Sequence, residues 1–597
     1  MIAPLAVALP FAAAALIALA GRWSPGVVID AAATAAAAAG AVLCAILVSR
    51  TAHRTLVYWF GGWRPKVGRF PLGISFTIDR FGAGLACFAF VLAAAMLVYS
   101  WHYVEDAHHL YAVLVLLFSA GLAGFALSGD LFNMFVFFEL MGVSAYALTA
   151  YRVEEEPALQ AAFNFAVSNS IGAFLVVFGL ALVYARTGSL SLAEIGRRLG
   201  THHDGLVIVA FALIVCGFLV KAAIFPFHFW LSDAYAAAPA PVCVLLAGVM
   251  SDVGLYAIAR VYWTVFDGPF AGSHHAVRAV LIGAGAVSAL LGGLMSVLQR
   301  HLKRLLAYAT ISELGCLLIG VALLTPDGAG GAAMTVLSHG LAKAALFMAC
   351  GLLLVACGDV DELSLYGRGR SLPLVGVVWL LGAVALASPP FLGTFTGHAL
   401  IEDAAHASGE AWVVPVIAIA TILSTGAIVR AGARVFLGVG GRRDPLLTQE
   451  PPESPNAREH PSVGLMTTVA LVLAAAGVAV GAWTGLAAHA RTAGHQFVDH
   501  HAYLAAVLQH RVVSSVGEQG WTTSRSSLVW AVITVVGSAA WGFASLYRGR
   551  WPRVVVSALT ALARPLKAVH TGHVGDYVAW LTFGVAAVGG AFAFVLR

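Results

Sequence analysis

The chain has 597 residues, of which 60% are hydrophobic and 11% are charged, and its formal net charge is +5. Soluble globular domains carry about 25% charged residues, so this composition excludes a soluble protein and predicts an integral membrane protein. A net charge this small does not indicate a nucleic-acid partner, and we expect none.

Apolar segments of spanning length recur along the whole chain. A membrane-spanning helix needs about 20 mostly apolar residues, and roughly sixteen segments meet this criterion. In chain order they are 2–20, 27–49, 80–101, 110–128, 130–151, 160–185, 206–238, 240–265, 276–299, 302–323, 328–357, 372–407, 412–438, 463–487, 527–547 and 574–596. The predicted fold class is an all-α, multi-pass membrane protein.

The polar stretches between these segments suggest how the chain is divided. Aromatic and β-branched residues around Gly61-Gly62 predict a short surface hairpin at 55–80. Scattered histidines at 488–526 fit a solvated loop better than a metal site. The predicted regions are N-terminal helices at 1–109, a first repeat at 110–265, a second repeat at 276–438, a proline-rich linker at 439–462, and C-terminal helices with a loop at 463–597.

Two predicted helices are interrupted. In one, Lys221 precedes Pro226, and in the other Pro389-Pro390 precedes His398. A break frees backbone groups, which is tolerated at membrane depth only where protein or a wet cavity satisfies them. Two similar breaks in two halves of a chain indicate an internal repeat with the transport route at the breaks.

Ionisable side chains at membrane depth are functional candidates by default. We expect Glu139 to pair with Lys221, because each charge would hold the other ionised in a low dielectric. A change in their separation would then move the lysine proton. The alternative is a static salt bridge between two helices, since structural ion pairs also perturb pKa values.

Further candidates follow along the chain. His339 and Lys343 are four residues apart, which places both on one helix face. Asp252 follows Lys221 on the next helix, and His398 at the second break could act as the last relay. Four residues are accessory candidates, and they are Lys303, Glu313, Glu402 and Asp403. We expect Lys303 to extend toward the membrane interface.

Other chemistry has no support in the sequence. The glycine-rich stretch at 327–334 lacks the phosphate-binding pattern, and none of the seven cysteines forms a C-x-x-C motif. We therefore predict no catalytic residue, cofactor-binding residue, metal site or cofactor. Basic residues cluster in three places predicted to be cytoplasmic loops, and they include Arg300, Lys303 and Arg304, then Arg430, Arg434, Arg442 and Arg443, and finally Arg548, Arg550 and Arg553.

Four stretches carry a family resemblance. They are "GDLFNMFVFFELMGVSAYAL", "VKAAIFPFHFWLSDAYAAAPAPV", "LKRLLAYATISELG" and "SHGLAKAALFMACG". With them, the chain resembles the antiporter-like proton-translocating subunits of respiratory complex I, membrane-bound hydrogenases and Mrp-type cation/proton antiporters. The second stretch looks closest to the Mrp D-type subunit, whereas the tail "HTGHVGDYVAWL" looks more like the distal subunit of complex I.

The resemblance implies a specific architecture and specific roles. It implies about fourteen core helices in two inverted five-helix repeats, with discontinuous helices 7 and 12, and about two extra C-terminal helices. It also implies Glu139 and Lys221 as the first-half pair, with His339 and Lys343 as the central relay. Two residues depart from the family pattern: Asp252 replaces a lysine or neutral polar residue, and His398 replaces a lysine or glutamate.

The sequence thus predicts a subunit that moves protons, or cations and protons, within a larger membrane complex. The expected partners are other membrane subunits, lipid, and a redox module of the iron–sulfur, hydrogenase or quinone kind. The expected location is the inner (plasma) membrane. Two alternatives stay open: a non-conducting anchoring subunit, and the membrane subunit of an inorganic-carbon uptake system.

Overall fold

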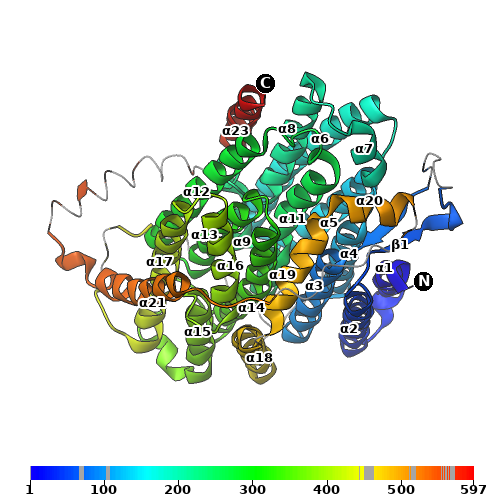
Figure 1. Ribbon diagram of the computed structural model, residues 1–597. Helices are drawn as coiled ribbons and strands as arrows, with labels where there is room; N and C mark the ends of the chain where they lie inside the picture. The colour runs from blue at the N-terminus through cyan, green and yellow to red at the C-terminus, as the bar shows by residue number, and fades with distance from the viewer. Residues whose placement is uncertain are drawn as a thin grey trace.

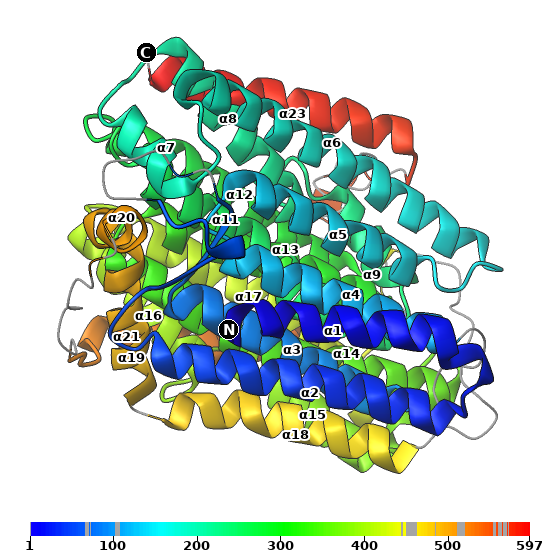
Figure 2. The same ribbon diagram turned by 90° about the vertical axis from the view of Figure 1, so that its right-hand side faces the viewer.

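The computed structural model describes residues 2–596 except 66–70, 72, 102–107, 443, 445, 449–462, 484, 510, 512–519, 553, 555–556, 559–560, 562–563, 565–569 and 571. In these residues the chain is almost entirely helical (Figures 1 and 2). Fourteen helices among them are long and apolar enough to cross a membrane. The other two predicted segments, 206–238 and 372–407, are the interrupted helices.

The first half of the chain runs as far as the second π-helical turn. Its elements are α1 (Ile2–Ala20), η1 (Gly21–Trp23), α2 (Gly26–Arg50), β1 (Leu56–Trp59), η2 (Phe60–Gly62), β2 (Ser75–Ile78), α3 (Arg80–Tyr99), α4 (His108–Leu127), α5 (Leu131–Thr149), α6 (Glu156–Thr187), α7 (Leu192–Leu199), α8 (Gly205–Lys221), α9 (Phe229–Ala237), α10 (Ala240–Leu245), η3 (Leu246–Met250), α11 (Asp252–Val261) and η4 (Tyr262–Phe266).

The second half and the C-terminal region follow. Their elements are α12 (His274–Leu298), α13 (Leu302–Ala322), α14 (Pro326–Cys357), η5 (Arg368–Ser371), α15 (Pro373–Leu386), α16 (Gly393–Ala407), α17 (Val413–Gly432), η6 (Ala433–Leu437), α18 (Val463–Ala482), α19 (Gly485–Val498), α20 (His500–Leu508), α21 (Arg525–Ser545), η7 (Arg548–Arg550) and α23 (Val574–Val595).

Local sequence explains where several helices begin. Asp79, Asp130 and Asp204 precede α3, α5 and α8, and each carboxylate accepts a hydrogen bond from a backbone N–H of the first turn. Such N-caps satisfy donors that have no partner inside the helix. Asp130 and Asp204 therefore fix the starts of the helices that carry Glu139 and Lys221.

Two short strands lie in the segment where the hairpin was predicted. β1 and β2 pair antiparallel, with Leu56 opposite Ile78 and Trp59 opposite Ser75. All four residues of β2 are buried, so this part of the predicted surface hairpin lies inside the protein.

The core is centred on α13. All residues in the most apolar stretch of this helix are buried. Small residues let the neighbouring backbone come close. A Cβ at Gly292 of α12 would lie 2.4 Å from the Ser312 nitrogen, and one at Gly315 of α13 would lie 2.4 Å from the Ala289 nitrogen. Close backbone approach at small residues is how membrane helices gain packing energy without a hydrophobic driving force.

Both predicted breaks are present. Residues 222–228 separate α8 from α9, and residues 387–392 separate α15 from α16. Each break holds non-glycine residues at positive φ, namely Ala223 in the first, and Ser388 and Phe391 in the second. Such conformations cost free energy and persist only where the surrounding structure imposes them.

The prediction of a loop at 488–526 is wrong for its first part. His489 and His495 lie on α19, while His500 and His501 lie on α20. The histidines are scattered, but the apolar residues between them are buried, as Phe497 and Tyr503 show. His510 lies outside the described residues, as does most of the predicted linker at 439–462.

Candidate ion-translocation site

Lys221 is the last residue of α8 and is completely buried. Its Nζ lies 4.9 Å from the ring centroid of Phe138 and 5.8 Å from that of Phe165, and it has no hydrogen-bond partner among the described residues. Aromatic faces attract an ammonium group, more strongly where water is excluded. The lysine is thus held by rings rather than by a fixed carboxylate.

An indole group satisfies a backbone carbonyl at the break beside Lys221. Trp230 of α9 donates a hydrogen bond from Nε1 to the Val220 carbonyl at 2.9 Å. Its ring also stacks on Phe165, with centroids 4.4 Å apart and planes 4° apart. The carbonyl freed by the interrupted helix is therefore satisfied, as membrane depth requires.

Glu139 does not form the direct ion pair predicted with Lys221. Its Oε1 is buried and has no hydrogen-bond partner among the residues that the structure describes. The two charges act on each other electrostatically, but within the described residues no contact joins them. Gly142 of the same helix lies close to the ammonium group, because a Cβ there would lie 3.7 Å from Nζ.

Glu313 of α13 is the centre of a second cluster. Its Oε2 lies 3.3 Å from Nε2 of His339 on α14, and its Oε1 lies 3.3 Å from Nε2 of His398 on α16. His398 reaches back through Nδ1 to the Ser388 hydroxyl, 3.2 Å away in the second break. A residue expected to be accessory therefore joins the central helix to the broken one.

Lys343 and Asp252 lie beside this cluster. Lys343 is 2% exposed, and it interacts electrostatically with both Glu313 and Asp252. Asp252 follows the π-helical turn η3, a rare feature that is frequent at functional sites. Its carboxylate lines a mostly apolar cavity of about 610 Å³ that α2, α3, α13, α14 and α19 also line.

The two clusters meet where α11 crosses the end of α8. Gly254, two residues after Asp252, packs against the first break. A Cβ at Gly254 would lie 2.6 Å from the Phe218 carbonyl oxygen and 2.8 Å from the Ala222 nitrogen. The helix that carries Asp252 is therefore in direct backbone contact with the start of the break.

The other accessory residues lie elsewhere. Lys303 is fully buried and donates to the Ala238 carbonyl at 2.8 Å, so the prediction that it extends to the interface is wrong. Glu402 accepts from the Ser526 hydroxyl at 2.7 Å, and Asp403 accepts from the Trp521 indole at 3.0 Å. Both acids face the segment that leads into α21.

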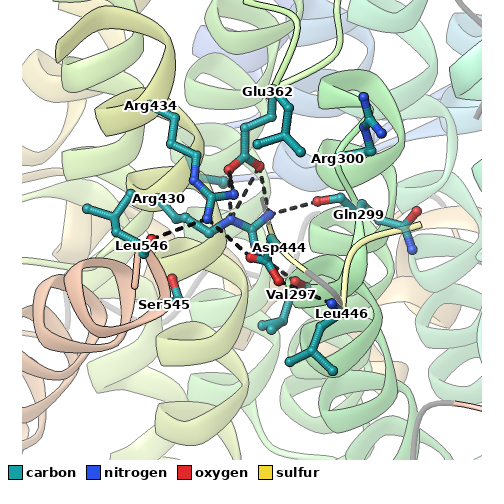
Figure 3. Close-up of polar contacts among 12 residues, drawn as sticks. Val297, Gln299, Arg300, Glu362, Arg430, Arg434, Asp444, Leu446, Ser545 and Leu546 are labelled. Carbon is teal, nitrogen blue, oxygen red and sulfur yellow. Dashed lines mark hydrogen bonds and ion pairs between the residues drawn. The ribbon is translucent and has the colours of Figure 1, made fainter. Parts of the chain in front are cut away.

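A buried network of arginines and acids was missed by the sequence analysis (Figure 3). Glu362 accepts from Arg430 at 2.9 Å and from Arg434 at 2.7 Å, and neither its side chain nor the two arginine side chains are exposed. Arg430 also donates to the Val297 and Gln299 carbonyls, at 2.6 and 2.7 Å. Arg430 and Arg434 are therefore not the loop residues predicted from their charge.

Asp444 and Arg548 complete this network. Arg434 donates to Asp444 at 3.2 Å, and Arg548 lies 3.9 Å from the same carboxylate. Burial and the positive charges of the neighbouring arginines lower the pKa of Arg548, which follows the last turn of α21, to about 9. The network ties α12, α17 and η7 together at one end of the second half.

Comparisons with known proteins give the family. The chain matches the family described as NADH:quinone oxidoreductase/Mrp antiporter, TM, over residues 128–424. It is 34% identical over 466 residues to the NADH-quinone oxidoreductase subunit N of Desulforudis audaxviator, covering 77% of this chain and 89% of that protein. The chain belongs to this family. It is also 29% identical to the D-type subunit of the Na(+)/H(+) antiporter of Bacillus subtilis, over 74% of this chain and 86% of that one.

Solved structures of membrane complexes contain similar chains. One is the archaeal membrane-bound sulfane sulfur reductase, with a TM-score of 0.74 and 26% identity over 85% of this chain and 99% of that one. Another is the Mrp complex from Dietzia sp. DQ12-45-1b, with a TM-score of 0.73 and 25% identity over the same shares. The predicted family is confirmed, and the chain is an antiporter-type membrane subunit.

Proposed function

We propose that this subunit translocates protons, or exchanges cations for protons, along its buried ionisable residues. The observation that carries this proposal is the pair of buried charge clusters, each placed at an interrupted helix. Buried charges in membrane helices are rare and mark ion pathways. The family supports the same conclusion, since relatives are named as Na(+)/H(+) antiporter subunits.

The proposed route starts at Glu139 and Lys221. It continues through Asp252 on α11 to Lys343, then to the Glu313–His339 pair and finally to His398. Its first step depends on the environment of the Lys221 ammonium group, which has no hydrogen-bond partner among the described residues. A buried ammonium group without a partner is costly to keep charged. A change in charge at Glu139 then decides whether Lys221 keeps or releases its proton.

The proposal extends to partners and location. We propose the plasma (inner) membrane as the location of the subunit. We also propose that it contacts other membrane subunits, because the matched structures are chains of multisubunit membrane complexes. The driving force would come from a redox module or from an opposing ion gradient.

Two other functions compete with this one. A non-conducting anchoring subunit is favoured by the family departures at Asp252 and His398, although the Glu313–His398 contact keeps His398 tied into the cluster. The membrane subunit of an inorganic-carbon uptake system would require a zinc-bearing partner. Subunit and metal analysis of the complex purified in mild detergent separates these cases. Zinc would support carbon uptake, and iron would support a redox-driven pump. A complex that contains neither metal would support an antiporter.

The direct test is Lys221→Met in the intact complex. Proteoliposomes carrying a pH dye would be driven by an imposed Na⁺ or K⁺ gradient and, where iron is found, by redox turnover. We expect transport to fall on the order of 100-fold or more, as when a proton-transfer group is lost. Arg50→Met at the exposed end of α2 is the control and should leave transport unchanged. Normal transport by an assembled Lys221→Met complex would refute the proposal.

A further inference from the structure

The C-terminal arm, His570 and Gly572–Leu596, packs in a different part of the fold from α21. α21 packs on α17 in the second half, whereas α23 packs along α6, α8 and α12 (Figure 2). The chain therefore returns to the first half and covers its broken helix.

Specific contacts hold the arm on the break. A Cβ at Gly584 of α23 would lie 2.6 Å from the Pro226 ring and 2.5 Å from the Phe227 ring, so the arm packs directly on side chains of the break. The Asn164 side chain of α6 donates to the Gly572 carbonyl at 2.7 Å. The Tyr577 hydroxyl donates to the carboxylate of Asp233 on α9. The arm is thus fixed to helices on both sides of the break.

At the end of the break, the arm brings one histidine against another. Nε2 of His570 lies 3.2 Å from Nε2 of His228, the residue immediately before α9. His228 is 1% exposed, and its Nδ1 has no hydrogen-bond partner in the described chain. Because a neutral imidazole has one donor and one acceptor nitrogen, one ring must donate and the other accept. The pair can therefore take up one additional proton, but two would place like charges in contact.

Packing connects this pair to Lys221. His228 and Phe229 contact the His570 ring, and Trp230 then stacks on Phe165, whose ring faces the Lys221 ammonium. The same short segment, 221–230, thus has the lysine at one end and the histidine pair near the other. Other titratable or charged groups close to the pair are Tyr308, Tyr577, Asp233 and Arg304.

We propose that His570 and His228 form a proton-exchange pair through which protons move between the Lys221 compartment and the surface of the protein. In the step itself, the proton on Nε2 of one protonated ring passes to Nε2 of the other, so the first ring becomes neutral and the second becomes the imidazolium. The C-terminal arm supplies a residue of the first half-channel. This inference rests on the proposed function, because it requires Lys221 to exchange protons.

The test compares His570→Gln with Lys221→Met in the reconstituted complex. Glutamine keeps a hydrogen-bond donor near the ring position but cannot be protonated. We expect His570→Gln to lower transport on the order of 100-fold and to remove the dependence of the rate on pH that a protonatable imidazole gives. His573→Gln on the same arm is the matched control and should keep both the rate and the pH profile. A contact that only holds the arm would not change that profile.

A second variant guards against a loss of assembly. His570→Ala opens space at the half-buried His570, and added imidazole should restore transport if the residue carries protons. Failure of imidazole to restore transport in assembled complexes would overturn the inference. Normal rate and pH profile in His570→Gln, with Lys221→Met inactive, would also overturn it while leaving the proposed function standing. An active Lys221→Met complex would instead refute the proposed function.

Discussion

The two halves of the subunit treat their buried charges differently. In the first half, Lys221 and Glu139 each have a buried polar atom without a hydrogen-bond partner in the described part of the chain, and aromatic rings face the lysine. In the second half, Glu313 contacts both His339 and His398 at 3.3 Å. An unpartnered buried ion is costly, whereas direct pairing offsets much of the desolvation cost. The first half is therefore more responsive to a nearby change of charge, and the second half is more firmly held.

The largest effect should come from comparing Glu313→Gln with Glu139→Gln. Glu313→Gln removes the carboxylate that two histidines contact and that acts electrostatically on the buried Lys343. Leaving a buried charge uncompensated typically costs about 3–5 kcal/mol. We expect Glu313→Gln to lower both transport and the melting temperature of the complex. Glu139→Gln should lower transport with little change in melting, since it breaks no contact among the described residues. Thermal unfolding followed by tryptophan fluorescence measures the difference, and equal melting shifts would contradict this view of the two halves.

The network around Glu362 should also stabilise the second half of the subunit. Glu362→Gln removes the charge that two fully buried arginines share. We expect a loss of about 3–5 kcal/mol in stability. Transport per assembled complex should be unchanged, because among the described residues the network contacts none of the proposed proton carriers. Glu154→Gln at an exposed position is the control. A transport defect without a melting shift would show that the network belongs to the pathway.

Much of the fold follows from the sequence because local signals determine it. Apolar segment length identifies the spans, and Pro226 and Pro389-Pro390 mark both breaks. The candidate residues on α14 were also predictable, since four-residue spacing places His339 and Lys343 on one face. The α19 and α20 helices were missed because their histidines and short length resemble a solvated loop.

The contacts that organise the site are tertiary and had no local signal. Glu313 and His398 are 85 residues apart, and Arg430 and Glu362 are 68 residues apart. Arg430 and Arg434 also end an apolar helix, which is where membrane proteins usually place interfacial basic residues. The one available clue was their four-residue spacing within a helical stretch. His228 was missed because its partner, His570, lies 342 residues away.

The smallest effect should come from Gly254→Ala, which tests how the two halves are joined. The new Cβ would lie 2.6 Å from the Phe218 carbonyl oxygen and 2.8 Å from the Ala222 nitrogen. These are backbone atoms that cannot rotate away, so α11 must move, at a cost of about 1–3 kcal/mol typical of overpacking. Since α11 carries Asp252, its displacement changes the spacing between the Lys221 break and the Glu313 cluster.

We expect Gly254→Ala complexes to assemble but to transport more slowly, with the defect in rate rather than in ion selectivity. Gly283→Ala on α12 is the matched control, because nothing lies within 4 Å of a Cβ there and alanine is the better helix former. Initial rates in proteoliposomes at equal protein content make the comparison. Equal rates for the two variants would mean that the halves exchange protons without the packing of α11 on the break, and the coupling would then have to be sought in the charges alone.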